Sequence, residues 1–148
     1  MSEPKPLYWT DSTRKLSDLV PWEVNPRQIK ADQARRLRGS LKKFGQPWPV
    51  VIGPNNELYD GHQRLKVWGE EWGYELEVAV RVSNRPLTEA ERKELVITAH
   101  KGAVGEWDFD LLANNFEVDD LIEWGFSEYE LGIPAEIDYS GDIIYEVK

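Results

Sequence analysis

The stretch from Tyr59 to Leu65 (YDGHQRL) brings several chemically useful side chains into one short turn. Asp60 is an acid, His62 titrates near neutral pH, and Arg64 is a permanent cation. Gly61 stands between a strand-like run and a helix-like run, where a glycine lets the backbone approach a ligand closely. The first amides of a helix have no partners within it, so this corner suits a phosphate group.

Asp60 and His62 differ in the chemistry that each could supply. Mg²⁺ prefers carboxylates, water and phosphate oxygens, so Asp60 is the expected metal ligand. His62 is the better candidate for acid–base catalysis because an imidazole titrates near neutral pH. The pattern leaves one alternative open, in which both residues only shape the turn and cap the helix.

The flanking sequence predicts the elements that hold this corner. Residues 49–53 (PVVIG) form a short apolar run typical of a buried strand, and residues 54–57 follow as a turn. The return strand begins at residues 58–59. From residue 62 to about residue 72 the apolar positions fit a helix, which closes near Gly73.

The remaining pattern predicts further elements on both sides of this corner. Thr88 and Glu91 form a capping box that opens a helix, and Asp32 is expected to cap an earlier helix that ends at Gly45. We expect strands at residues 14–20 and 76–82, a loop at 21–27, helices at 32–44, 88–100, 108–115, 118–124 and 127–131, and a tail or edge strand at 138–148.

Charge is distributed very unevenly along the chain. The 148 residues have a net charge of −9, but residues 1–100 hold 16 Lys or Arg against 14 Asp or Glu, whereas residues 101–148 hold 2 against 13. The lack of cysteine excludes disulfides, thiol catalysis and cysteine-based zinc sites. No apolar run is long enough to cross a membrane and the N-terminus does not resemble a secretory signal, so we expect a cytoplasmic protein.

A basic segment precedes Gly45, where the first predicted helix ends. Residues 27–43 carry seven basic side chains against Asp32 alone. The candidate nucleic-acid contacts are Arg27 and the helical stripe of Arg35, Arg38 and Lys42. An overall pI of about 4.8 argues against strong non-specific DNA binding, and the acidic residues 106–130 are an alternative partner for this segment within the same chain.

The order of several short motifs resembles the ParB N-terminal domain, which shares its fold with sulfiredoxin. The motifs are Leu19-Val20-Pro21 with Asn25-Pro26-Arg27, Phe44-Gly45, Pro49-Val50-Val51-Ile52, and Gly61-His62-Gln63-Arg64. The resemblance covers roughly residues 14–132. It implies an α/β fold, a small mixed sheet flanked by helices with a short acidic helical C-terminal extension. We therefore expect an N-terminal arm (1–13), a nucleotide-binding domain (14–104) and an acidic helical extension and tail (105–148).

The resemblance also implies a ligand. Partition ParB domains bind CTP and relatives bind or hydrolyse ATP, so a nucleoside triphosphate with Mg²⁺ is expected here. Its phosphates would lie at Gly61, His62, Gln63 and Arg64, facing a wall formed by Gly45, Trp48 and Pro49. Trp48 is also placed to stack on a base.

This chain departs from the family pattern in ways that bear on activity. His62 and Gln63 replace the Glu and Arg of the partition ParB box, which puts CTP specificity and sliding-clamp behaviour in doubt. The missing cysteine excludes sulfiredoxin chemistry. The Asp60-Gly61-His62-x-Arg64 sequence is closer to the box of a free-serine kinase, whose catalytic glutamate would correspond to Glu23.

Three functional hypotheses follow from the sequence. The first is a nucleotide-binding module in the DNA metabolism of a phage or mobile element, with Mg²⁺-dependent nucleotide hydrolysis or nuclease activity as its possible chemistry. The second is a small-molecule kinase that uses Glu23 as base. The third is a non-enzymatic protein whose acidic C-terminal segment binds a protein partner or mimics DNA. A homodimer is compatible with the first hypothesis, because partition relatives dimerise.

Overall fold

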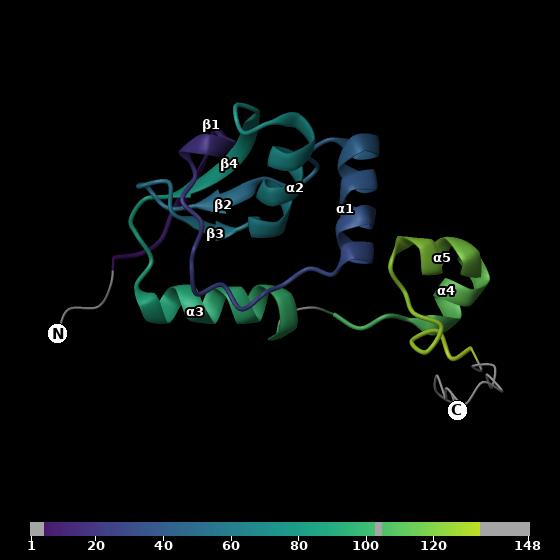
Figure 1. Cartoon of the computed structure of the whole chain (residues 1–148). Coiled ribbons are helices and arrows are strands. Elements are labelled where there is room, and N and C mark those ends of the chain that lie inside the picture. Colours follow the sequence, from purple (N-terminus) through teal and green to yellow (C-terminus); the bar gives the residue numbers. More distant parts are fainter. Residues whose placement is uncertain (1–4, 103–104, 134–148) are drawn as a thin grey trace. The chain divides into compact units, whose positions relative to one another are not determined.

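The computed structural model describes residues 5–102 and 105–133 of the chain (Figure 1). The chain divides into two compact units, Met1–Val104 and Gly105–Lys148. Among the described residues, no helix is long and apolar enough to span a bilayer. The tail or edge strand expected at residues 138–148 lies outside the described residues.

The larger unit is built on a mixed sheet with the strand order β1-β4-β2-β3. The strands are β1 (Trp9–Lys15), β2 (Val50–Ile52), β3 (Leu58–Asp60) and β4 (Glu77–Ser83). β4 is antiparallel to β1 and parallel to β2, and β2 is antiparallel to β3. The alternation in β4 explains its place in the sheet, because Val78 and Val80 are buried while Glu77 and Ala79 are exposed.

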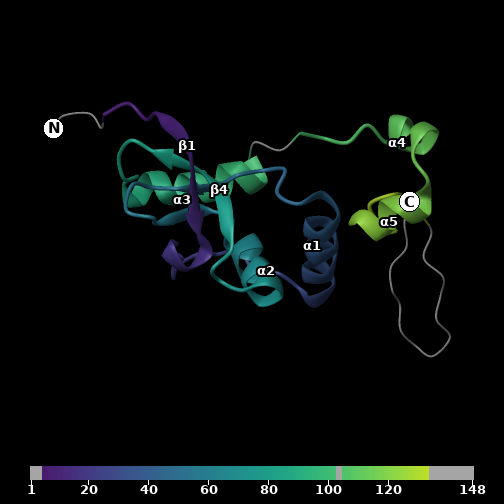
Figure 2. The same cartoon turned by 90° about the horizontal axis from the view of Figure 1, so that it is seen from above.

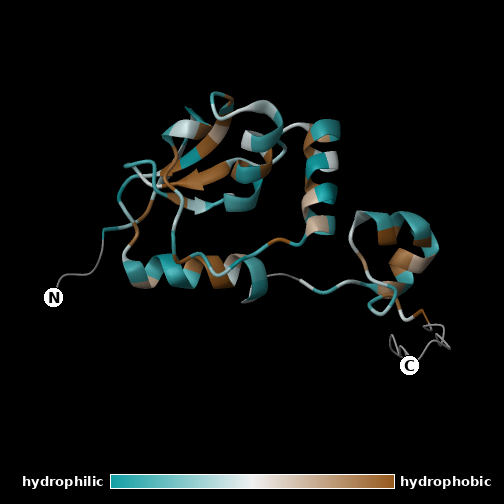
Figure 3. Cartoon of the chain, in the orientation of Figure 1, coloured by the Kyte–Doolittle hydropathy of each residue, from teal (hydrophilic) through white to brown (hydrophobic). Residues whose placement is uncertain are grey.

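The core forms between the sheet and two helices that pack on each other, α1 (Ala31–Phe44) and α2 (His62–Trp72) (Figure 2). Strand β2 is its apolar centre (Figure 3), and Val50 and Ile52 are fully buried. Leu41 from α1 and Trp68 from α2 belong to the same cluster. Burial of side chains of this size contributes about 1.5–3 kcal/mol each, so this cluster holds the two helices to the sheet.

Helix α3 (Glu89–Ile97) packs against β3 and continues into a π-helical turn, η2 (Thr98–Gly102). The predicted capping box is confirmed: Thr88 Oγ1 accepts the Glu91 amide at 3.1 Å, and the Glu91 carboxylate accepts the Thr88 amide at 2.8 Å. Because a π turn closes through i→i+5 bonds, the side chains that follow it leave the regular face of the helix.

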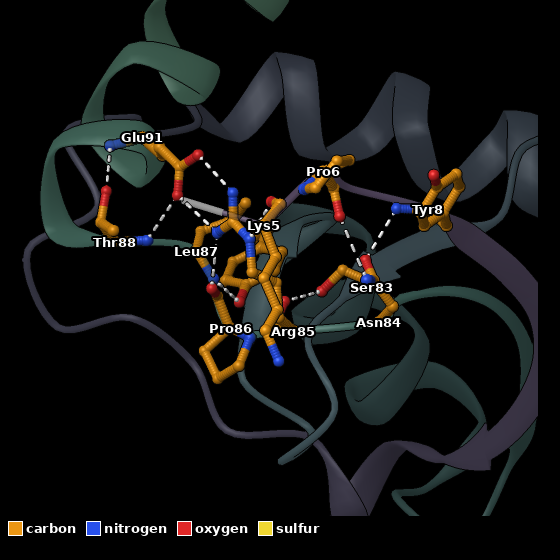
Figure 4. Close-up of polar contacts among 11 residues, drawn as sticks. Lys5, Pro6, Tyr8, Ser83, Asn84, Arg85, Pro86, Leu87, Thr88 and Glu91 are labelled. Atoms are coloured by element: carbon orange, nitrogen blue, oxygen red, sulfur yellow. Dashed lines mark hydrogen bonds and ion pairs between the residues drawn. The ribbon is translucent and has the colours of Figure 1, made fainter. Parts of the chain in front are cut away.

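Glu91 also fixes the start of α3 to the chain that leaves β4 (Figure 4). Arg85 donates through Nη1 and Nη2 to the two Glu91 carboxylate oxygens, each at 2.8 Å, and through Nε to the carbonyl oxygen of Lys5 at 2.7 Å. Asn84 Oδ1 accepts from the amide of Tyr8 at 2.7 Å. This Arg85–Glu91 clamp therefore joins the start of α3, the end of β4 and the segment before β1.

The described part of the smaller unit, residues 105–133, contains two short helices, α4 (Phe109–Asn115) and α5 (Val118–Trp124), as the sequence predicts. Asp108 caps α4, where its Oδ1 accepts two backbone amides. The helix expected at residues 127–131 is absent, and the segment forms turns instead. There Ser127 and Glu130 exchange side-chain and backbone bonds at 3.0 and 3.1 Å, which close one turn without continuing into a helix.

Three predictions about the N-terminal half were wrong. Residues 9–13, expected as part of an arm, belong to β1, and residues 16–18 form the 3-10 helix η1 (Leu16–Asp18) rather than a strand. β1 lies at the edge of the sheet and is mostly polar, which hides it from an apolar pattern. Lys30, not Asp32, is the N-cap of α1, and Asp32 lies in the first turn and pairs with Arg36 at 3.0 Å.

Candidate functional site

The candidate site begins at Gly61, which joins β3 to α2. Its φ of 117° lies in the left-handed region that side chains other than glycine's rarely adopt. A Cβ at this position would also lie 3.1 and 3.2 Å from the two methyl carbons of Val50. No side chain caps α2, so its first amides are available to an anion.

Arg64 joins α2 to Trp48 and Pro49, two of the residues expected to form the wall that faces the phosphates. Its Nη1 donates to the carbonyl oxygen of Trp48 at 2.8 Å and approaches that of Pro49 at 3.4 Å. Its Nη2 lies 3.5 Å from Asp60 Oδ2. Burial lowers the pKa of Arg64, although a guanidinium stays charged at neutral pH. Since a guanidinium has five donors, Arg64 can hold this wall and still face a ligand.

His62 is engaged with the protein backbone. Its Nε2 accepts the amide of Trp22 at 3.0 Å, so the neutral ring carries its proton on Nδ1. Burial, and then the positive charge of Arg92, lower the pKa of His62 to about 4. The ring is therefore neutral at physiological pH with one nitrogen occupied, which suits a structural acceptor better than a proton carrier.

His100 lies beside Asp60, which sequence reasoning missed. His100 Nε2 is 2.9 Å from Asp60 Oδ1, and His100 Nδ1 is 2.6 Å from Arg27 Nη1. An arginine can only donate, so Nδ1 accepts and Nε2–H donates to the carboxylate. Arg27, His100, Asp60 and Arg64 thus form a continuous chain of polar contacts.

Arg92 is a second residue that sequence reasoning missed. Its Nη2 donates to the carbonyl oxygen of Leu58 at 2.7 Å. Its guanidinium lies over the rings of Trp22 (4.7 Å) and Tyr59 (5.2 Å). These contacts set the positive charge of α3 close to His62, and they connect the loop before α1 to the sheet.

Two neighbouring cavities in the larger unit meet at Asp60, Arg64 and His100. The smaller, of about 390 Å³, is also lined by Arg27 and the Gly61–Gln63 start of α2. The larger, of about 990 Å³, is more apolar, and its walls include Trp9, Trp48, Pro49 and Leu95. A more polar compartment therefore adjoins a more apolar one, as the phosphates and the base of a nucleotide would require.

The residues expected at the phosphate site lie together, and of the wall expected to face them only Gly45 lies apart. Gly61, His62, Gln63 and Arg64 line the smaller cavity, and Trp48 and Pro49 line the larger. Gly45 only ends α1, with a φ of 70°, and lines neither cavity.

Glu23 and the basic stripe lie apart from the cavities. Glu23 is exposed in the loop before α1 and lines neither cavity, so this geometry does not favour its role as a kinase base. Arg38 and Lys42 both pair with Glu71 of α2, at 3.5 and 2.7 Å. Arg35 is exposed on α1.

No family model matches the chain. The chain is similar to the ParB-like nuclease domain-containing protein YnaK of Escherichia coli strain K12, with 36% identity over 52 residues. These residues are 35% of this chain and 60% of the relative, so the match spans less than two thirds of the relative's length.

Solved structures with the same fold include ParB proteins and ParB N-domains. The Pnob8-like ParB-N domain matches with a TM-score of 0.53 and 21% identity, over 74% of this chain and 42% of that one. A C-terminally truncated ParB from Caulobacter crescentus, complexed with CTP-γ-S, matches with a TM-score of 0.56 and 14% identity, over 83% and 75%. These structures confirm the predicted α/β class. The chain therefore has the fold of these ParB structures, and part of its sequence is similar to a ParB-like nuclease domain-containing protein.

Proposed function

We propose that the chain is a nucleotide-binding module that acts in DNA metabolism, with the phosphates of a nucleoside triphosphate at Gly61–Arg64. The observation that carries this proposal is the left-handed Gly61 at the uncapped start of α2, on the wall of the smaller cavity. Backbone amides at such a helix start attract negative charge. Arg27 and Arg64 line the same cavity and add two cations.

The base of the nucleotide would occupy the larger cavity. Trp48 lines this cavity and is 68% exposed, so its ring has a free face for stacking. The Caulobacter crescentus ParB of the same fold is complexed with CTP-γ-S, which makes CTP the first nucleotide to test here, followed by ATP.

Asp60 would repel a triphosphate unless a cation lay between them. Within residues 5–102 and 105–133, no cluster of three or more His, Cys, Asp or Glu could hold a metal alone. A single carboxylate nevertheless fits Mg²⁺, which takes the rest of its ligands from phosphate oxygens and water. Asp60 would therefore hold Mg²⁺ only together with the nucleotide.

Mg²⁺-dependent hydrolysis of a nucleotide or of DNA is the second candidate function, in keeping with the name of the Escherichia coli relative. The specific observation is the 2.9 Å contact between His100 and Asp60 at the junction of both cavities. His100 could take a proton at Nδ1 if a ligand drew Arg27 away. A role in a phage or another mobile element belongs to the same proposal.

Calorimetric titration with CTP, ATP and GTP, with and without Mg²⁺, tests nucleotide binding. We expect micromolar binding to the wild type, and a loss of about 2 kcal/mol, or roughly thirtyfold, in Arg27→Gln and in Arg64→Ala. Lys66→Gln is the matched control, because Lys66 is an exposed cation on α2 that lines neither cavity. Absence of saturable binding, or an equal loss in the control, would overturn the proposal.

Hydrolysis is measured separately, as phosphate release from the bound nucleotide and as cleavage of single- and double-stranded DNA. Asp60→Asn should abolish turnover and the Mg²⁺ dependence of binding, while His100→Gln should slow turnover with little effect on affinity. Tight binding without turnover under any of these conditions would leave the module non-catalytic and remove the second candidate.

A further inference from the structure

The smaller unit has a charge of one sign. Its described residues, 105–133, contain nine Asp or Glu and no Lys or Arg. Acidic side chains precede or lie on both helices, and most of them are exposed. An acidic surface alone identifies no ligand, so the kind of partner has to be inferred from the other features of this unit.

One of these acidic residues, Glu130, lines an apolar groove of about 410 Å³ between α4 and α5. Trp107 and Phe126 meet edge to face in its wall, with their ring centres 5.1 Å apart. Leu112 and Leu121, both buried, also line it, and Trp124 borders it with 63% of its surface exposed. We call this feature, lined by Trp107, Leu112, Phe116, Leu121, Trp124, Gly125, Phe126 and Glu130, the acidic groove.

The smaller unit exposes many large apolar side chains to solvent. Among its described residues, seven large hydrophobic side chains are exposed: Trp107, Phe109, Leu111, Phe116, Val118, Trp124 and Tyr129. Contiguous exposed apolar surface with a polar rim marks interaction sites, and aromatic residues are enriched where partners bind. The groove, which Trp107, Phe116 and Trp124 line, is therefore a candidate docking surface.

The negative charge of the unit and the apolar lining of the groove together indicate which kind of partner would bind. Nucleic acids and anionic membrane surfaces are negatively charged, so nine carboxylates repel both. A mimic of DNA needs the charges but has no use for an aromatic groove. A cationic amphipathic helix satisfies both features, with an apolar side chain seated between aromatic rings and Lys or Arg against the rim.

We propose that the acidic groove docks a basic amphipathic helix of another protein. Trp107 and Trp124 are the anchors for its apolar face, and Glu123 and Glu130 attract its basic face. This site does not depend on the nucleotide site, so Arg27→Gln should leave peptide binding intact while it weakens nucleotide binding.

The test uses the full chain and a fluorescent synthetic helical peptide with lysines on one face and leucines on the other. A peptide of the same composition, scrambled so that the leucines share no face, is the control for charge alone. Anisotropy titration should show saturable binding of the helical peptide, at least about tenfold tighter than the scrambled one. Added salt should weaken the binding.

Variants locate the site. Trp124→Ala should weaken the helical peptide about tenfold or more, whereas Phe109→Ala, an exposed aromatic of the same unit that does not line the groove, should not. Glu123→Gln, beside Trp124 and exposed, should reduce both affinity and its salt dependence without disturbing the fold.

Three outcomes would overturn the proposal. Equal binding of the two peptides would reduce the surface to non-specific charge attraction. Unchanged binding in Trp124→Ala would place the peptide elsewhere. Self-association of the wild type that Trp124→Ala abolishes, without peptide binding, would assign the groove to a second copy of this chain.

Discussion

The two histidines of this chain lie close to the same carboxylate and face it in different ways. His100 contacts Asp60 directly, whereas His62 accepts the amide of Trp22 and shares its surroundings with Arg92. His62, which the sequence motif predicts for proton transfer, is therefore the histidine that is held neutral. The residue that contacts the carboxylate comes from a π turn almost forty positions later in the chain.

Removal of the Arg92 charge should release His62. In Arg92→Met the pKa of His62 should rise from about 4 toward its ordinary value of 6.5, because a repelling cation has gone while the attraction of Asp60 remains. Proton NMR titration of the ring signals measures this directly, since the chain has only two histidines. An unchanged pKa would mean that burial alone sets it.

The Gly61–Arg64 cluster could be predicted at the residue scale because it is contiguous in the sequence. His100 could not, because its place beside Asp60 depends on the packing of α3 and on the π turn after it. One signal was available: His100 falls at the C-terminal end of a predicted helix with a strong cap. Arg92 carried no signal, since an arginine in a helix is ordinarily solvated.

At the scale of elements, the Arg85–Glu91 clamp decides where α3 lies and hence where Arg92 and His100 lie. Arg85, and then the amide of Thr88, hold the pKa of Glu91 down at about 2. A depressed carboxyl pKa contributes stability that is present above the unfolded value, near 4.5, and is lost as the pH falls through about 2.

We therefore expect Glu91→Gln to lower the thermal midpoint by a few degrees at pH 7 and to make less difference at pH 2. Glu89→Gln is the control, because Glu89 lies in the same first turn but only approaches Lys93, at 4.0 Å. Circular dichroism melts across this pH range measure both variants. Equal loss in the two variants would point to helix-dipole effects rather than to the clamp.

Helix α1 shows how pairing can mask a basic stripe. Glu71 lies against Arg38 and Lys42, and Lys42 lowers its pKa by hydrogen bonding. Glu71→Gln should leave these cations without their counter-charge and raise affinity for duplex DNA several-fold at low salt. Anisotropy with a labelled duplex measures the change. Glu70→Gln is the control, because Glu70 is exposed on α2 beside Glu71. If wild type and variant bind equally weakly, α1 is not a DNA contact.

Elements punctuated by glycine were predicted well, because Gly45, Gly61 and Gly73 stop or start helices whatever the rest of the fold does. The residues of β1 could not be assigned in this way. Their side chains alternate with little apolar content, and only the pairing with β4 makes them a strand. The helix expected at residues 127–131 did not form. The bonds between Ser127 and Glu130 close one turn there, but no apolar face extends it into a helix.

At the scale of the whole molecule, chemistry and charge are divided between two units. The cavities belong to Met1–Val104, and the acidic groove belongs to Gly105–Lys148. A nucleotide should therefore slow amide hydrogen exchange at the start of α2 and the end of α3, and leave α4 and α5 unchanged. Mass spectrometry of proteolytic peptides resolves these regions. Protection of α4 or α5 by nucleotide would show that the units communicate.

The edges of the sheet have a consequence for solubility. β1 forms one edge with a row of threonine, serine and charged side chains, and β3 at the other edge is only three residues long, with Val20 bridging beside it at Glu57. Charged or very short edge strands resist pairing with the strands of other molecules. The same polarity that disguises β1 as an arm thus protects the domain from edge-to-edge aggregation.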